Sequence, residues 1–98
     1  MSEGLGQDHD ARVLKRMIVD LENYKSQDIT LRQLVDRLEG GLRALENKPP
    51  AKFSTQFYDY WGGLEQYLAA GTESVRKGKI IGEVNSLIMI IENELVNK

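Results

Sequence analysis

The segment "DITLRQLVDRLEGGLRALENKPP", residues 28–50, contains both ends of one helix and therefore decides how the rest of the chain is read. Thr30 and Gln33 form a T-x-x-Q capping box, and Ile29 and Leu34 can provide the hydrophobic contact that accompanies it. The two prolines end the helix, because proline restricts the residue before it and cannot extend the hydrogen-bond ladder. Between these signals, one face is lined by Leu31, Leu34, Val35, Leu38, Leu42 and Leu45.

The same period of 3.6 residues recurs on both sides of this segment. It predicts a helix from Ala11 to about Lys25, one around an aromatic stripe that ends at a Gly71 cap, and one from about Ile80 to the end. No stretch alternates as a β-strand does. We therefore predict an all-α protein, an antiparallel four-helix bundle with short loops. The expected core residues of these helices are Val13, Leu14, Met17, Ile18, Leu21 and Tyr24; Phe53, Phe57, Trp61, Leu64 and Leu68; and Ile80, Val84, Leu87, Ile88, Ile91 and Leu95.

Length and composition indicate one soluble domain. The 98 residues are 41% hydrophobic and 29% charged, which is typical of a globular domain. The first ten residues contain no periodic apolar residue, so we expect a mobile tail at 1–10 and a single helical domain at 11–98. The longest apolar run, "LIMII", is far too short to span a bilayer, the start lacks the features of a secretory signal, and cysteine is absent. These features predict a cytoplasmic protein with no membrane segment.

Catalytic and metal-binding patterns are not found in the sequence. It has no nucleophile beside a base, no glycine-rich phosphate loop and no carboxylate pair in a distinctive setting. The one histidine, His9, stands between two aspartates in the expected tail, where three consecutive residues cannot easily converge on one ion. Arg76, Lys77 and Lys79 are expected in a solvated connection. We therefore predict no enzyme activity, no catalytic residue, no metal site and no cofactor.

Two adjacent glycines, Gly62 and Gly63, interrupt the third helix, although each costs about 1 kcal/mol relative to alanine. They lie roughly 130° to either side of the Trp61 stripe, on the half of the helix that faces away from the core. One interpretation is a tolerated irregularity beside a bulky tryptophan. The other is a flat patch where another molecule approaches the backbone closely. On this second interpretation, the partner-binding residues are Tyr58, Asp59, Gly62 and Glu65.

Charge is distributed unevenly along the chain, although the net charge is only −2. Residues 11–48 hold eight Lys or Arg against six Asp or Glu, whereas residues 53–75 and residues 80–97 each hold three acids and no base. A nucleic-acid binder usually shows a basic stripe instead. The layout favours a basic protein partner over direct contact with nucleic acid, because an acidic face speeds and orients such an encounter.

A family resemblance covers residues 29–70, "ITLRQLVDRLEGGLRALENKPPAKFSTQFYDYWGGLEQYLAA". The segment contains I-(S/T)-L-x-x-L, then L-x-A-L-E, a proline-containing loop, F-x-x-x-W and L-E-x-x-x-A. This arrangement resembles short bacterial all-helical immunity proteins of polymorphic toxin systems, including contact-dependent growth inhibition systems. The matched residues are mostly core leucines and Trp61, and the glycine pair after Trp61 departs from the pattern. The resemblance implies a helical fold and a role in binding a cognate toxin.

These observations together predict an immunity protein in the cytoplasm, a monomer or weak homodimer. It would neutralise a bacterial toxin, with a nuclease as the favoured class, by blocking a basic surface through the third and fourth helices. One alternative is a helical scaffold or homodimer subunit, because Ile81, Met89 and Ile90 lie beyond the core stripe of the last helix. A DNA-binding regulator is the less favoured alternative, because "DITLRQLVDRLEGG" lacks the short turn and recognition helix that such a reader needs.

Overall fold

The computed structural model of the chain describes residues 2–96, with side chains from residue 9 onward. These residues form four α-helices and no strand: α1 (Ser2–Lys25), α2 (Leu31–Ala44), α3 (Ala51–Ala70) and α4 (Lys77–Val96). The predicted all-α class is therefore confirmed.

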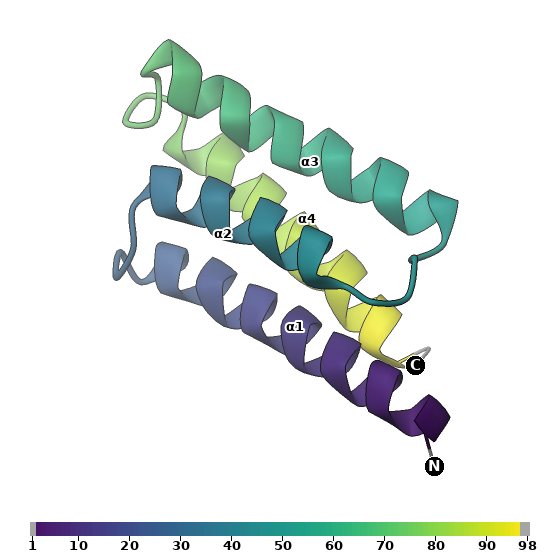
Figure 1. Cartoon of the computed structure of the whole chain (residues 1–98). Helices are drawn as coiled ribbons and strands as arrows, with labels where there is room; N and C mark the ends of the chain where they lie inside the picture. The colour runs from purple at the N-terminus through teal and green to yellow at the C-terminus, as the bar shows by residue number, and fades with distance from the viewer. Residues whose placement is uncertain (1, 97–98) are drawn as a thin grey trace.

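The four helices pack as a bundle around one core (Figure 1). Each helix has two neighbours in the bundle: α1 contacts α2 and α4, and α3 contacts α2 and α4. The beginning of α1 and the end of α4 lie at the same end of the bundle (Figure 1). The buried hydrophobic residues are Leu14, Met17, Leu21, Tyr24, Leu31, Leu34, Val35, Leu38, Phe53, Phe57, Leu64, Ile80, Val84, Leu87, Ile88 and Ile91. All of them belong to the stripes that the sequence predicts.

The predicted start of α2 is confirmed in detail. The Gln33 backbone N–H donates to Thr30 Oγ1 at 3.1 Å, and the Thr30 backbone N–H donates to Gln33 Oε1 at 2.9 Å. The helix ends at Ala44, ahead of the two prolines. Local side-chain chemistry thus fixes both ends of this element.

Replacing Thr30 with alanine is expected to lower the free energy of unfolding by about 1 kcal/mol, because the Gln33 amide loses its acceptor. Urea denaturation followed by far-ultraviolet circular dichroism measures this change. Thr30→Ser keeps the hydroxyl and serves as the matched control. A midpoint that does not move in Thr30→Ala would contradict this account of the start of α2.

The C-terminal half also follows the sequence closely, with one shift. Gly71 adopts a φ of 66°, in the left-handed region, and ends α3 with its N–H directed at the Leu68 carbonyl. The helix α4 begins at Lys77, three residues before the predicted Ile80. Lys77 and Lys79 therefore lie in a helix and not in the connection, because apolar periodicity marks only the buried part of a helix.

The helix start predicted at Ala11 is wrong. The helix α1 continues back to Ser2. Asp10 is fully buried, and its two carboxylate oxygens accept the backbone N–H groups of Glu46 at 2.8 Å and Asn47 at 2.9 Å. His9 Nε2 lies 2.9 Å from the Ala44 carbonyl oxygen. The sequence does not predict these polar contacts with the end of α2, because apolar periodicity reports only the spacing of hydrophobic residues.

The expected placement of Trp61 in the core also needs correction. Phe53, Phe57 and Leu64 are buried, but Trp61 is only partly buried and packs at the edge of the core. Its indole N–H donates to the Val35 carbonyl oxygen of α2 at 3.0 Å. An indole N–H needs an acceptor when it leaves water, and a carbonyl on the neighbouring helix provides one at the edge of the core.

Candidate partner-binding surface

The outer face of α3 presents the four residues that the sequence singles out: Tyr58, Asp59, Gly62 and Glu65, called here the α3 strip. Tyr58 is 46% exposed, and both carboxylates are exposed. Neither Asp59 nor Glu65 forms an ion pair with any residue that the structure describes. The strip therefore combines an accessible aromatic ring with two negative charges that no cation in the described part of the chain neutralises.

Tyr58 is held in place by the ring beside it. Its ring meets Trp61 edge to face, with centroids 5.9 Å apart, and meets Phe57 in the same manner at 5.7 Å. Trp61 is in turn fixed to α2 through its indole N–H. Because the Tyr58 ring leans on an anchored neighbour, it loses less freedom on binding than a free surface tyrosine would.

The two adjacent glycines of α3 have different surroundings. A Cβ placed on Gly62 would meet no atom within 4 Å, so this position is open, as predicted. A Cβ placed on Gly63 would lie 2.5 Å from Glu83 Oε1 and 2.7 Å from Oε2. Gly63 therefore faces α4, and the prediction that both glycines face away from the core is wrong. The helix α3 packs against two neighbours, so its buried arc is wider than the single stripe defined by Trp61.

Glu83 is the most unusual acidic group at the α3–α4 contact. Its Oε2 atom is buried and has no hydrogen-bond partner among the described residues. Burial raises the pKa of Glu83 above the ordinary value of 4.5, because a carboxylate loses its hydration at this contact. The absence of a side chain at Gly63 provides the space that this carboxyl group occupies.

Glu83 is expected to make the fold less stable as the pH rises. Below the pKa of the unfolded glutamate, both states are protonated and the full stability is present; it declines as the pH rises through the raised pKa of the folded state. Glu83→Gln does not titrate, so its stability relative to the wild type should increase between about pH 4 and about pH 7. Urea midpoints of both proteins across this range test the prediction. A constant difference would contradict the burial of this carboxyl group.

A second polar cluster joins the end of α1 to the α3–α4 connection. The Tyr24 hydroxyl donates to Glu73 Oε2 at 2.7 Å and accepts from Lys77 Nζ at 2.9 Å, and this Nζ lies 4.4 Å from the Tyr24 ring centroid. Burial raises the pKa of Tyr24, and the hydrogen bond to Tyr24 raises the pKa of Lys77. Both groups keep their protons at neutral pH, so the cluster ties helices together and is not suited to acid–base chemistry.

The described residues contain neither a metal-binding cluster nor a membrane-spanning helix. Among the residues that the structure describes, no three His, Asp or Glu side chains are grouped so that they could hold a metal ion. Over the same part of the chain, none of the helices combines the length and the apolar character that crossing a bilayer requires. Comparison of the chain with protein-family models, with characterised proteins and with solved structures finds no match.

Sequence reasoning missed two features of this surface chemistry. The first is Glu83, which lies opposite Gly63 of α3. In the sequence, the only signal for it is that a polar residue stands beside the apolar stripe of the last helix. The second is a groove between α1 and α2 that is lined by Arg12, Arg16 and Arg37. Arg12 and Arg16 stand four residues apart, which places them on one face of a helix, but the sequence gives no indication that α2 leaves a hollow beside them.

Proposed function

We propose that this protein is a non-catalytic binding protein that uses the α3 strip to occupy a basic surface on a protein partner. The resemblance over residues 29–70 makes that partner a bacterial toxin, with a nuclease as the favoured class, and makes this chain its immunity protein in the cytoplasm. The antiparallel order of the helices belongs to the same proposal. The short connections and the course of the chain in Figure 1 support that order.

The observation that carries the proposal is the accessibility of the α3 strip. Gly62 has open space where a side chain would project, and two exposed carboxylates, without ion pairs to any described residue, lie on neighbouring turns of the same helix. Tyrosine is favoured at the centre of interfaces, and carboxylates suit a cleft that holds phosphates through Lys and Arg. An acidic helix face can therefore block such a cleft without any chemistry of its own.

The two charges of the strip are expected to act through the association rate. Asp59→Lys together with Glu65→Lys should slow association with the toxin by about tenfold or more and weaken its dependence on salt, since exposed charges steer the encounter. The toxin to use is the C-terminal domain encoded directly upstream of this gene, where an immunity gene is expected to have its partner. Biolayer interferometry at several salt concentrations measures the rate constants.

Gly62→Arg is expected to raise the dissociation rate constant instead, because it places a large side chain inside the contact. The matched control is Gly40→Arg, at a glycine of α2 that also has no atom within 4 Å of an added Cβ. Only the Gly62 variant should dissociate faster and lose protection of cells that express the toxin. Native rate constants in both strip variants, with full protection, would exclude the strip as the interface.

One observation favours a second candidate, a homodimer subunit. Met89 on α4 is 61% exposed, and Ile81 and Ile90 are only partly buried. Sedimentation equilibrium separates the two functions: a dimer at micromolar concentration that Met89→Lys dissociates supports the subunit, and a monomer supports the immunity protein.

A further inference from the structure

A groove of about 560 Å³ runs between α1 and α2, away from the α3 strip. The groove exists because two of the α2 residues that line it, Gly41 and Ala44, have no side chain or a very short one. Gly41 cannot be enlarged easily, since an added Cβ would lie 2.8 Å from Met17 Cγ and 3.1 Å from its Sδ. The hollow therefore lies where α1 and α2 pack closely.

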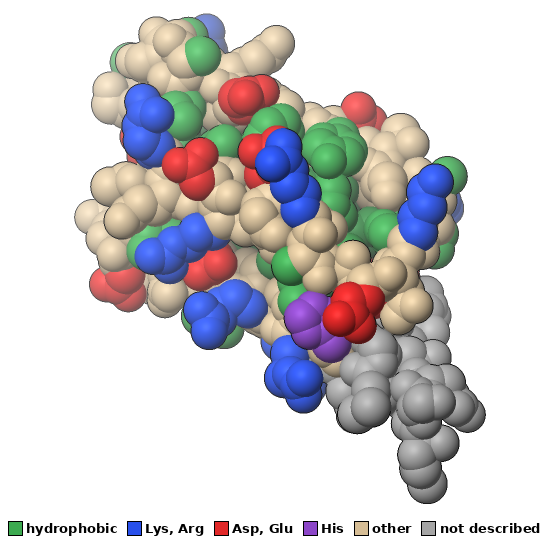
Figure 2. Space-filling view, viewed as in Figure 1, with side chains coloured by type: hydrophobic (Ala, Val, Ile, Leu, Met, Phe, Trp, Pro, Cys, Tyr) green, Lys and Arg blue, Asp and Glu red, His purple; other side chains and the backbone are tan. Residues whose placement is uncertain are grey.

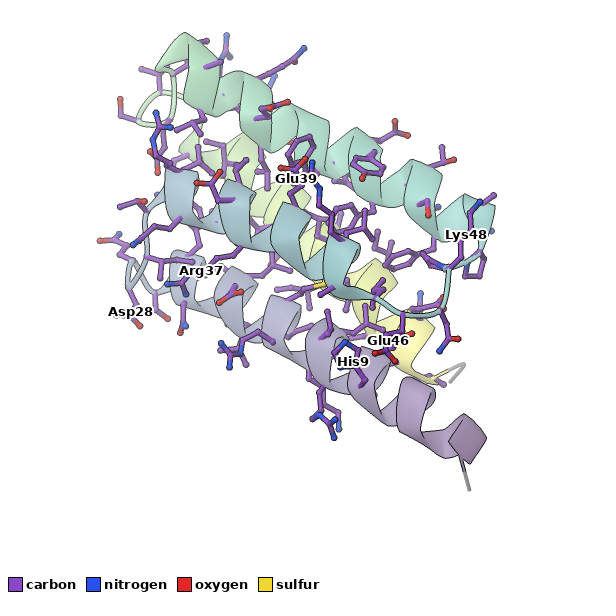
Figure 3. All side chains as sticks on the ribbon, in the orientation of Figure 1. His9, Asp28, Arg37, Glu39, Glu46 and Lys48 are labelled. Carbon is purple, nitrogen blue, oxygen red and sulfur yellow. The ribbon has the colours of Figure 1, made fainter. Side chains whose placement is uncertain are left out.

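Three arginines and one aspartate line this groove, so its net charge is positive. Arg12 and Arg16 are exposed on its α1 side, and neither forms an ion pair with a described residue. Arg37 projects from α2 toward α1, where its Nη1 lies 3.2 Å from Oδ1 of the buried Asp20 (Figure 3). Figure 2 shows Lys and Arg side chains close to His9, which lies at one end of the groove. One arginine is thus neutralised, and two remain available to an anion.

The donors of the groove indicate which anion it fits. Both walls come from within helices, so their backbone N–H groups are already used and the donors are side chains, the guanidinium groups and the His9 ring, whose Nε2 already contacts the Ala44 carbonyl. A guanidinium fork matches a carboxylate with two parallel hydrogen bonds. The lining also has an apolar part, Val13, Met17 and Gly41, called here the floor; the only acidic side chain in the lining, Asp20, is already paired with Arg37. A small anion alone would leave this floor uncovered, whereas a peptide segment can place an apolar side chain on it.

We propose that the α1–α2 groove binds an acidic, helical segment of a protein partner, with an apolar side chain on the floor and carboxylates on Arg12 and Arg16. These arginines are one helical turn apart, about 6 Å along the axis, and carboxylates four residues apart on a helix have the same spacing. The α3 strip, which is acidic, cannot bind such a segment. The groove therefore adds a second surface with the opposite preference, and it does not depend on the function proposed for the strip.

The test is a titration of the ¹⁵N-labelled protein with the peptide acetyl-AELAAELAAELA-amide, followed by amide chemical shifts. Saturable changes are expected at residues 12–17 and 37–44, with binding about tenfold or more tighter than that of the glutamine analogue acetyl-AQLAAQLAAQLA-amide. Arg12→Gln together with Arg16→Gln should weaken binding by at least about tenfold. The control, Arg32→Gln with Lys79→Gln, changes the net charge equally outside the groove and should bind as the wild type does.

Four results would overturn the proposal. They are no saturable change up to about 5 mM peptide, an equal loss in the control variant, equally strong binding of inorganic phosphate, or self-association that Arg12→Gln with Arg16→Gln abolishes. The last two would assign the groove to a phosphate group or to a second copy of this chain. The groove variant should still bind the toxin through the α3 strip, so failure of either proposal is distinguishable from failure of the other. The variant side chains are exposed, and an unchanged urea midpoint verifies that the fold is intact.

Discussion

Phe57→Ala is expected to lower the free energy of unfolding by about 3 to 5 kcal/mol. Phe57 is 0% exposed, and its ring stacks with Phe53 at a centroid distance of 6.1 Å. Truncation removes a whole ring from the contact of α3 with the core and leaves a cavity that the surrounding helices can fill only in part. Small domains have about 5 to 15 kcal/mol of stability in total, so the variant should be largely unfolded at modest urea concentrations. Urea denaturation monitored by far-ultraviolet circular dichroism measures the loss.

Trp61→Ala is the informative comparison for this variant. Trp61 is larger than Phe57 but only partly buried, with one hydrogen bond to the Val35 carbonyl. We expect Trp61→Ala to lower the free energy of unfolding by about 2 kcal/mol, less than Phe57→Ala does, because the exposed part of the indole contributes little to folding. A larger loss for Trp61→Ala than for Phe57→Ala would contradict the placement of the tryptophan at the edge of the core.

Asp10→Ala should also cause a large loss, about 3 kcal/mol. The carboxylate is 0% exposed and accepts two backbone N–H groups, those of Glu46 and Asn47. A hydrogen bond to a charged group contributes about 1.5 to 3 kcal/mol, and its removal leaves a desolvated amide without an acceptor. Chemical denaturation measures the effect.

Asp10→Asn and Asp59→Ala serve as controls for this prediction. Asparagine keeps one acceptor oxygen, so Asp10→Asn should lower the free energy of unfolding by less than Asp10→Ala does. Asp59 is an exposed acid on α3, and its removal should change stability little. If Asp10→Ala costs no more than Asp59→Ala, the carboxylate does not anchor the segment after α2 in solution.

The parts of the fold that local chemistry determines could be predicted from the sequence. Thr30 and Gln33 define the start of α2 through bonds between residues three apart, and Gly71 ends α3 by its own backbone conformation. The core stripes follow equally directly, since burial of one face needs only the helical period. Exposure of Tyr58, Asp59 and Glu65 was predictable for the same reason.

The parts that depend on contacts between helices could not be predicted. The hydrogen bonds of Asp10 join residues 36 and 37 positions apart, and the carboxyl group of Glu83 faces a glycine on another helix. A projection of α3 alone places Gly63 on the outside, because it does not include the position of α4. The groove beside Arg12 is likewise a property of two helices together, and no pattern within either helix encodes it.

The bonds between Asp10 and the segment after α2 also determine how the protein exchanges hydrogen with solvent. Amide hydrogens in a connecting segment usually exchange quickly, but those of Glu46 and Asn47 are bound to a buried carboxylate. We expect them to exchange mainly when the early part of α1 moves away and takes Asp10 with it. Their exchange rates therefore measure an opening that happens elsewhere, so residues far apart in the chain should exchange as one cooperative unit.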